Sequence, residues 1–163
     1  MRTLKGSIRN IRTKEIFEAE IKTFRLQDIK RFKKEDWQFN WEKEFADKCK
    51  TVVKLTTTGD PELIHGLLSI GDNADHIIMY LIESAAFNKG KTKLYEGIPG
   101  NLVAYACKLS FKLGYEGYVL FYAKSRLIRH YEETLGARSI GGLKMILDTN
   151  AAMRLITKFL KTD

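Results

Sequence analysis

The segment at residues 95–101 places two glycines and a proline between a predicted strand and a predicted helix. The first N–H groups of a helix have no acceptor inside it, and the helix dipole adds partial positive charge there. A phosphate group fits such a position. The N–H groups would come from Gly97, Ile98, Gly100, Asn101 and Leu102. The segment therefore predicts a phosphate site, and a tight loop without a ligand is the alternative.

The elements before this loop are predicted to form an antiparallel meander. Alternating or β-branched side chains predict strands over residues 16–23, 51–58, 62–70 and 76–86. Turn-forming residues at 59–61 and 71–73 separate the last three strands. Residues 27–48 are predicted to be helical in two pieces, with Trp37, Phe39, Trp41 and Phe45 as apolar anchors.

The elements after the loop place helices beside a buried strand. Apolar residues three and four apart predict a helix over residues 101–113, ended by Gly114. A strand at 117–123 should then pair in parallel with the strand at 76–86. A helix at 125–135 starting from the Ser125 hydroxyl, a strand at 140–147 and a helix capped at 148–150 complete the chain. This is a mixed α/β fold.

Composition sets the broad class of the protein. The 163 residues fit one domain, 1–163, with 44% hydrophobic and 29% charged residues. The sequence contains no apolar run of about 20 residues, so no membrane span is predicted, and we expect a cytoplasmic protein. The formal charge of +8 favours polyanions, although a solvated basic surface is the simpler interpretation. Three scattered histidines and two cysteines lack metal-ligand spacing, so no metal is predicted.

The order of strand, glycine loop, helix, strand and helix resembles the core of the GCN5-related N-acetyltransferases, abbreviated GNAT. The resemblance covers roughly the last half of the chain. It implies a mostly antiparallel sheet with a central splayed parallel pair, flanked by helices, and acetyl-coenzyme A as the acetyl donor. The family loop has Gln or Arg, two residues, Gly, one residue, then Gly or Ala. Aligned on Gly100, it puts Tyr95 at the basic position and Ile98 at the first glycine.

The resemblance also implies residues that handle protons. Family members often carry a glutamate like Glu83 as general base, and apolar neighbours could raise the pKa of this carboxyl. An ion-paired glutamate is the alternative. A family tyrosine, here Tyr131, can protonate the leaving thiolate, because a phenol with a pKa near 10 is protonated at neutral pH. The chain from Tyr131 to Gly136 is one residue longer than the family pattern, and a core tyrosine is the alternative.

Further contacts follow from the same resemblance. The strand backbone near Ala85 and Ala86 would pair with the pantetheine arm and stabilise the acetyl oxygen. Lys124 stands where the family often has Asn. The acceptor amine would meet Trp37, Trp41 and Asn88; a plain core is the simpler interpretation of the two tryptophans, and a turn of the chain is the alternative for Asn88.

Two functions are compatible with these features. The first is an acetyl-coenzyme A-dependent N-acetyltransferase in which a small-molecule or protein amine attacks the thioester directly. The second is a catalytically inactive module of the same fold, whose basic surface binds nucleic acid or an acidic protein; nucleic acid is the less favoured partner. Family members often dimerise, so the resemblance allows a homodimer.

Overall fold

The computed structural model describes residues 4–161, which form one mixed sheet of nine strands in the order β6-β1-β2-β3-β4-β5-β7-β9-β8. Neighbouring strands are antiparallel except for β5 and β7, which are parallel. The strands are β1 Leu4–Asn10, β2 Ile16–Thr23, β3 Thr51–Thr57, β4 Gly66–Asp72, β5 Ile77–Ser84, β6 Tyr95–Glu96, β7 Val119–Tyr122, β8 Arg138–Gly141 and β9 Lys144–Leu147.

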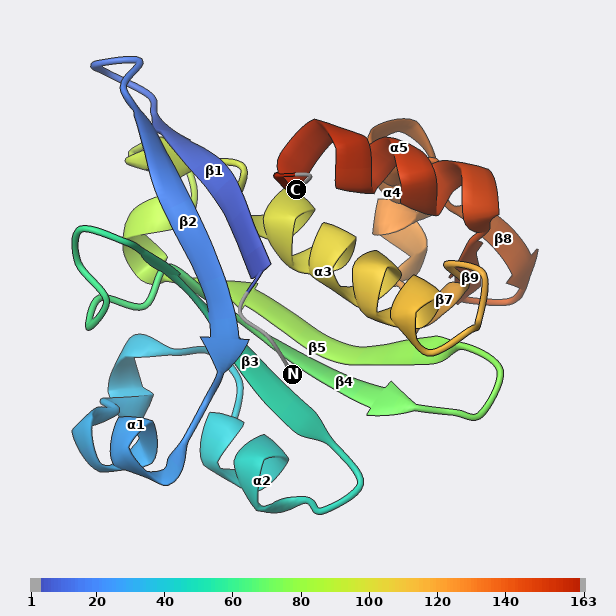
Figure 1. The fold of residues 1–163 in the computed structure, drawn as a ribbon, viewed down its shortest axis with the longest axis horizontal. Coiled ribbons are helices and arrows are strands. Elements are labelled where there is room, and N and C mark those ends of the chain that lie inside the picture. Colours follow the sequence, from blue (N-terminus) through green and yellow to red (C-terminus); the bar gives the residue numbers. More distant parts are fainter. Residues whose placement is uncertain (1–3, 162–163) are drawn as a thin grey trace.

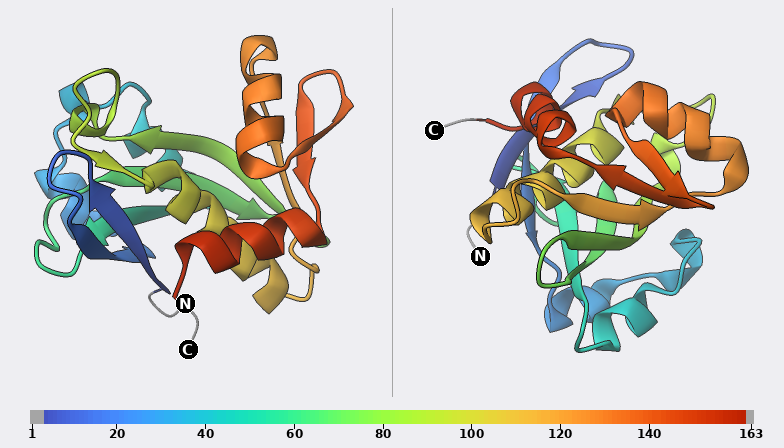
Figure 2. Two further views of the ribbon diagram at one scale, coloured as in Figure 1. Left: turned by 90° about the horizontal axis from the view of Figure 1, so that it is seen from above. Right: turned by 90° about the vertical axis from the view of Figure 1, so that its right-hand side faces the viewer.

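Helices cover both faces of this sheet (Figure 1). The α-helices are α1 Leu26–Arg31, α2 Trp41–Ala46, α3 Ile98–Lys112, α4 Ile128–Leu135 and α5 Thr149–Phe159. Short 3-10 segments are η1 Lys34–Asp36, η2 Ala86–Asn88 and η3 Ser125–Leu127. Helices α1 and α2 lie on one face, and α3 with α5 on the other (Figure 1). Seen from above, α5 crosses α3, while α4 stands beside the β8–β9 hairpin (Figure 2).

Alternating strand residues divide the core between the two faces. Val53 and Leu55 of β3 belong to the larger cluster with α3 and α5, whereas Val52 faces the smaller cluster around Trp41. Side chains point to opposite faces at successive strand positions, so one strand serves both clusters. The smaller cluster holds the α1–α2 segment against the sheet.

The predicted fold class is confirmed, including the meander of β3, β4 and β5 and the parallel β5–β7 pair. Helix α3 begins at Ile98, three residues before the predicted start, because Gly97 takes the left-handed conformation with a φ of 97° and ends the loop. The predicted Ser125 cap is wrong: Ser125 begins η3, and α4 starts after Leu127 without a side-chain cap. Asp148 caps α5 by accepting a hydrogen bond from the Ala151 N–H at 2.9 Å.

The C-terminal region contains more structure than the single strand predicted at 140–147. This region is a hairpin of β8 and β9, and β9 also pairs with β7. The chain then continues into α5, and Leu160 and Lys161 contact β1 through a bridge to Gly6 and a hydrogen bond to the Lys5 carbonyl. Among the helices described, none is long and apolar enough to cross a membrane.

Candidate active site

The parallel strands β5 and β7 separate after a short contact. Within residues 4–161, they pair only at Ile77 with Val119 and at Ile78 with Leu120. Strand β5 continues to Ser84 and β7 to Tyr122, so the two ends diverge. This splay opens the centre of the sheet where the resemblance places a thioester.

A cavity of about 480 Å³ occupies this opening. Three helices complete its walls: the first turn of α3, the inner face of α4 and the C-terminal turn of α5. The lining residues are Met79, Tyr80, Leu81, Ile82, Ser84, Gly97, Pro99, Gly100, Val103, Phe121, Tyr122, His130, Tyr131, Thr134, Leu135, Lys158 and Phe159. A second hollow of about 540 Å³ lies around His76 and Tyr115, near the opposite end of α3, and is more open to solvent. The cavity at the splay is therefore the candidate site.

The start of α3 presents its N–H groups to this cavity from few positions. Gly97 and Gly100 line it, whereas Pro99 has no N–H to offer. The Asn101 N–H donates to the Gly97 carbonyl at 3.1 Å, and Leu102 lies beyond the first turn. Of the five predicted donors, Gly97, Ile98 and Gly100 keep the N–H positions suited to a phosphate.

Asn101 uses its side chain to fix the helix rather than to face the cavity. It is fully buried, and its amide donates to the carbonyl oxygens of Ser7, at 2.8 Å, and Gly97, at 2.6 Å. These bonds fasten the first turn of α3 to β1. Ile98 and Leu102 are likewise buried in the larger core cluster. None of these three side chains lines the cavity, and of the three residues only Ile98 keeps an N–H position suited to a phosphate.

Four other predicted cofactor residues do not line the cavity. The ring of Tyr95 packs edge-on against His65 and Phe17, with centroid distances of 4.9 and 5.8 Å. Ala85 donates its N–H to the His65 carbonyl at 2.9 Å, so this group is not free to stabilise an acetyl oxygen. Ala86 begins η2, and Lys124 is exposed next to η3. The resemblance predicted that these residues face the bound cofactor, but β5 ends at Ser84 and the chain turns away from the splay at Ala85.

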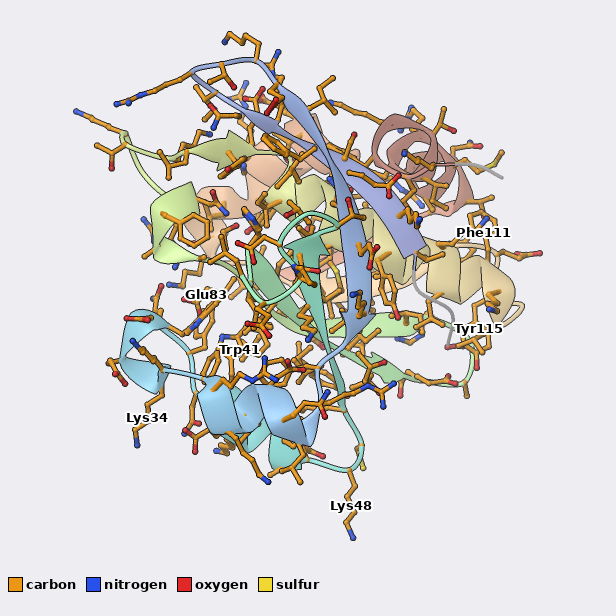
Figure 3. All side chains as sticks on the ribbon, turned by 60° about the vertical axis from the view of Figure 1, so that its left-hand side comes forward. Lys34, Trp41, Lys48, Glu83, Phe111 and Tyr115 are labelled. Carbon is orange, nitrogen blue, oxygen red and sulfur yellow. The ribbon has the colours of Figure 1, made fainter. Side chains whose placement is uncertain are left out.

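Glu83 lies on the α1–α2 side of the sheet, toward Trp41 (Figure 3). Its carboxylate accepts hydrogen bonds from four donors. Its carboxylate accepts from the N–H groups of Gln38 at 2.7 Å and Phe39 at 3.1 Å. Trp41 Nε1 and Lys89 Nζ donate to it at 2.8 and 3.1 Å.

These contacts set the acidity of Glu83. Burial raises the pKa of the carboxyl, but the hydrogen bonds from Gln38, Trp41, Phe39 and Lys89 outweigh burial and lower it. The expected raised pKa is therefore wrong. A carboxylate held by four donors and only 4% exposed is poorly placed to collect a proton. Its geometry fits an anchor for the segment between η1 and α2.

Tyr131 is the predicted proton-handling residue that does line the cavity. It is half-buried on α4, and its ring meets Phe121 of β7 edge-on at a centroid distance of 5.5 Å. His130, next to it, is exposed and also lines the cavity. The longer segment before Gly136 therefore does not turn Tyr131 away from the splay.

None of the three predicted acceptor residues lines the cavity. Trp41 is fully buried in the smaller core cluster, and Trp37 stacks on Phe32 with a centroid distance of 5.7 Å. Trp37 also lines two shallow hollows, of about 270 and 330 Å³. Asn88 is buried, donating to His65 and accepting from the Tyr95 N–H at 3.2 Å. Of the three, Trp37 alone lines a described hollow.

Lys158 and Phe159 are cavity residues that the sequence analysis missed. Both come from the last turn of α5, far from the loop in sequence. The apolar spacing of α5 predicts that the helix packs on the core, yet nothing in that spacing tells which end of α3 it meets. A long-range contact of this kind has no local signal.

Comparisons with solved structures identify the fold family of this chain. No protein-family model and no curated protein matches the sequence. Among solved structures, AtaTR bound with AcCoA is similar with a TM-score of 0.61 at 13% identity, covering 85% of this chain and 98% of that one. Mutant forms of the spermidine/spermine N-acetyltransferase SpeG from Vibrio cholerae give a TM-score of 0.57 at 13% identity, covering 83% and 96%. A KacTA–DNA complex gives 0.55 at 11%, covering 85% and 98%. With its splayed β5–β7 pair, the chain is a divergent example of the GNAT fold.

Proposed function

We propose that this protein is an acetyl-coenzyme A-dependent N-acetyltransferase in which an amine attacks the thioester directly. The observation that carries the proposal is the cavity of about 480 Å³ at the splay of β5 and β7, which the first turn of α3 and Tyr131 also line. The neighbours described as AtaTR bound with AcCoA and as the N-acetyltransferase SpeG support it through their shared fold.

The cavity has the character that an acyl-coenzyme A requires. Met79, Ile82, Val103 and Phe121 form an apolar wall suited to the pantetheine arm. Gly97 and Gly100 line the cavity at the start of α3, where their N–H groups suit the pyrophosphate. No Asp or Glu is among the lining residues described, so the cavity brings no carboxylate against an anion. Bound there, acetyl-coenzyme A would supply an activated acetyl group.

Tyr131 is the residue that we propose for proton transfer. Its contact with Phe121 fixes the ring between α4 and the splayed strand, and because Tyr131 lines the cavity we assign its phenol the role of proton donor to the leaving thiolate. Glu83 acts indirectly in this proposal. By holding the backbone of Gln38 and Phe39, it fixes the α1–α2 segment on the side of β5 opposite the cavity.

Calorimetric titration with acetyl-coenzyme A tests this function. Ser84→Phe should fill the cavity from β5, because Ser84 lines it and is partly exposed. Ser139→Phe, on exposed β8 outside the cavity, is the matched control. We expect micromolar binding by the wild type and the control, and a loss of at least about tenfold in Ser84→Phe, which equals roughly 1.4 kcal/mol. Folded wild-type protein that gives no binding signal would contradict the proposal; if it binds, a screen of amines follows.

The second candidate, an inactive module with a basic surface, rests on a different part of the molecule. The Ile11 N–H donates to the Leu94 carbonyl at 2.9 Å, which joins the β1–β2 turn to the segment before β6. Arg12, Lys14, Lys91 and Lys93 are all exposed on these two segments. If this surface binds nucleic acid, affinity must fall steeply with salt. Flat binding across salt, or none, would remove this candidate.

A further inference from the structure

The loop before α3 brings no cation to the cavity. Tyr95, at the position where the family pattern has Gln or Arg, packs its ring against Phe17 and His65 and does not line the cavity. Lys91 and Lys93 of the preceding segment are exposed and do not line the cavity. Two phosphates would therefore depend on backbone N–H groups alone if the loop were the whole site.

Helix α5 brings a cation to the same place. Lys158 is the one Lys or Arg among the cavity-lining residues of the described chain. Its ammonium lies 5.2 Å from the ring centroid of Phe159, within the range of a cation–π contact. Phe159 in turn covers Gly100, so Lys158 stands beside the first turn of α3.

The helix end that carries Lys158 is fixed by the backbone that follows it. Leu160 bridges Gly6, and the Lys161 N–H donates to the Lys5 carbonyl at 2.9 Å. These links hold the end of α5 against β1, the strand to which Asn101 also ties α3. A cation on a clamped helix end loses less freedom on binding an anion than one on a loose loop.

We propose that Lys158 binds the pyrophosphate of an acyl-coenzyme A, in place of the basic residue that the loop lacks. The inference rests on the proposed function and deepens it, because it assigns the charge that recognises the phosphates to α5. An alternative role for Lys158 is to offset the negative end of the α5 dipole, which would affect stability and not binding.

Titrations of four proteins with two ligands test the assignment. The proteins are the wild type, Lys158→Gln, Lys158→Arg and Lys112→Gln. The last is the control, because Lys112 is exposed at the far end of α3 and its substitution removes the same single positive charge. The ligands are acetyl-coenzyme A and its 3′-dephospho form, which keeps the pyrophosphate. Thermal unfolding of each variant separates a loss of binding from a loss of fold.

We expect Lys158→Gln to weaken the binding of both ligands by the same factor. This factor should be about tenfold, as for a lost hydrogen bond to a charged group. Lys158→Arg should bind within about threefold of the wild type, since it keeps the charge. Lys112→Gln should match the wild type. Unchanged binding by Lys158→Gln overturns the inference and leaves the proposed function standing. Weakening confined to the 3′-phosphorylated ligand also overturns it, because Lys158 would then contact that phosphate. A wild type that binds neither ligand overturns the proposed function together with this inference.

Discussion

A Cβ atom on Gly100 would lie 2.2 Å from Cζ of Phe159, so α5 can pack on the first turn of α3 only because residue 100 has no side chain. The glycine at residue 100 thus admits an aromatic ring from α5. A charged substitution at Gly100 would therefore disturb the helix packing as well as any phosphate, which is why Ser84→Phe is the cleaner test of binding.

This packing predicts that Gly100→Ala has opposite effects on stability in the wild type and in a Phe159→Ala background. Gly100→Ala should destabilise the wild type by about 1–3 kcal/mol, as expected when a well-packed contact is overfilled. In a Phe159→Ala background the ring is gone, and Gly100→Ala should be neutral or stabilise by up to about 1 kcal/mol through its helix propensity. Urea unfolding of the four proteins measures both steps. An equal cost of Gly100→Ala in both backgrounds would contradict the packing.

Glu83 is predicted to be a stability residue. Glu83→Ala leaves Trp41 Nε1 and the N–H groups of Gln38 and Phe39 without their acceptor and should cost about 2–4 kcal/mol. Glu42→Ala, which removes an exposed carboxylate from α2, should cost less than about 0.5 kcal/mol. Chemical unfolding at neutral pH compares them. A cost for Glu83→Ala as small as that of Glu42→Ala would show that the anchor contributes little.

The lowered pKa of Glu83 also gives a pH dependence. A carboxyl with a depressed folded pKa stabilises the native state above its ordinary value of 4.5, and this contribution fades as the pH falls below that value. Wild-type stability should therefore decline below about pH 4.5 more steeply than that of Glu83→Gln, which cannot ionise. Parallel curves for the two proteins would exclude this contribution.

As the pH falls, the loss of stability caused by protonation of His65 should begin at a higher pH than the loss caused by Glu83. Burial lowers the pKa of His65 to about 4, although the charge of Asp60 opposes this shift. The native state favours the neutral ring, so its stabilisation is complete above the ordinary pKa of 6.5 and is lost as the pH falls from 6.5 toward 4. The full effect is about 3 kcal/mol. Unfolding free energies between pH 7.5 and 4 should show this decline in the wild type and lack it in His65→Gln. His130→Gln, at an exposed histidine, should keep the decline.

The sequence predicted which residues of β5 share a face of the sheet, but not which element covers each face. Alternation correctly separates Glu83, which binds the α1–α2 segment, from Ser84, which lines the cavity. The pattern could not tell that Ser84 faces the cavity while Glu83 faces the α1–α2 segment, because both faces of β5 are covered by helices. The helical spacing of α3 and α5 predicted the two helices themselves. Their contact at Gly100 and Phe159 joins residues distant in sequence, and only the assembled fold reveals it.

Tyr131→Phe should separate chemistry from binding if the proposed function holds. The change removes the phenol oxygen and keeps the ring that meets Phe121 edge-on, so the cavity wall and the affinity for acetyl-coenzyme A should stay within about twofold. Loss of a general acid should lower kcat by about 10²-fold or more with whichever amine the screen identifies. Tyr122→Phe is the matched control, because Tyr122 is 64% exposed and also lies at the cavity. Calorimetry gives the affinities, and thiol release gives kcat. A Tyr131→Phe protein with wild-type kcat would show that another group, or water, supplies the proton.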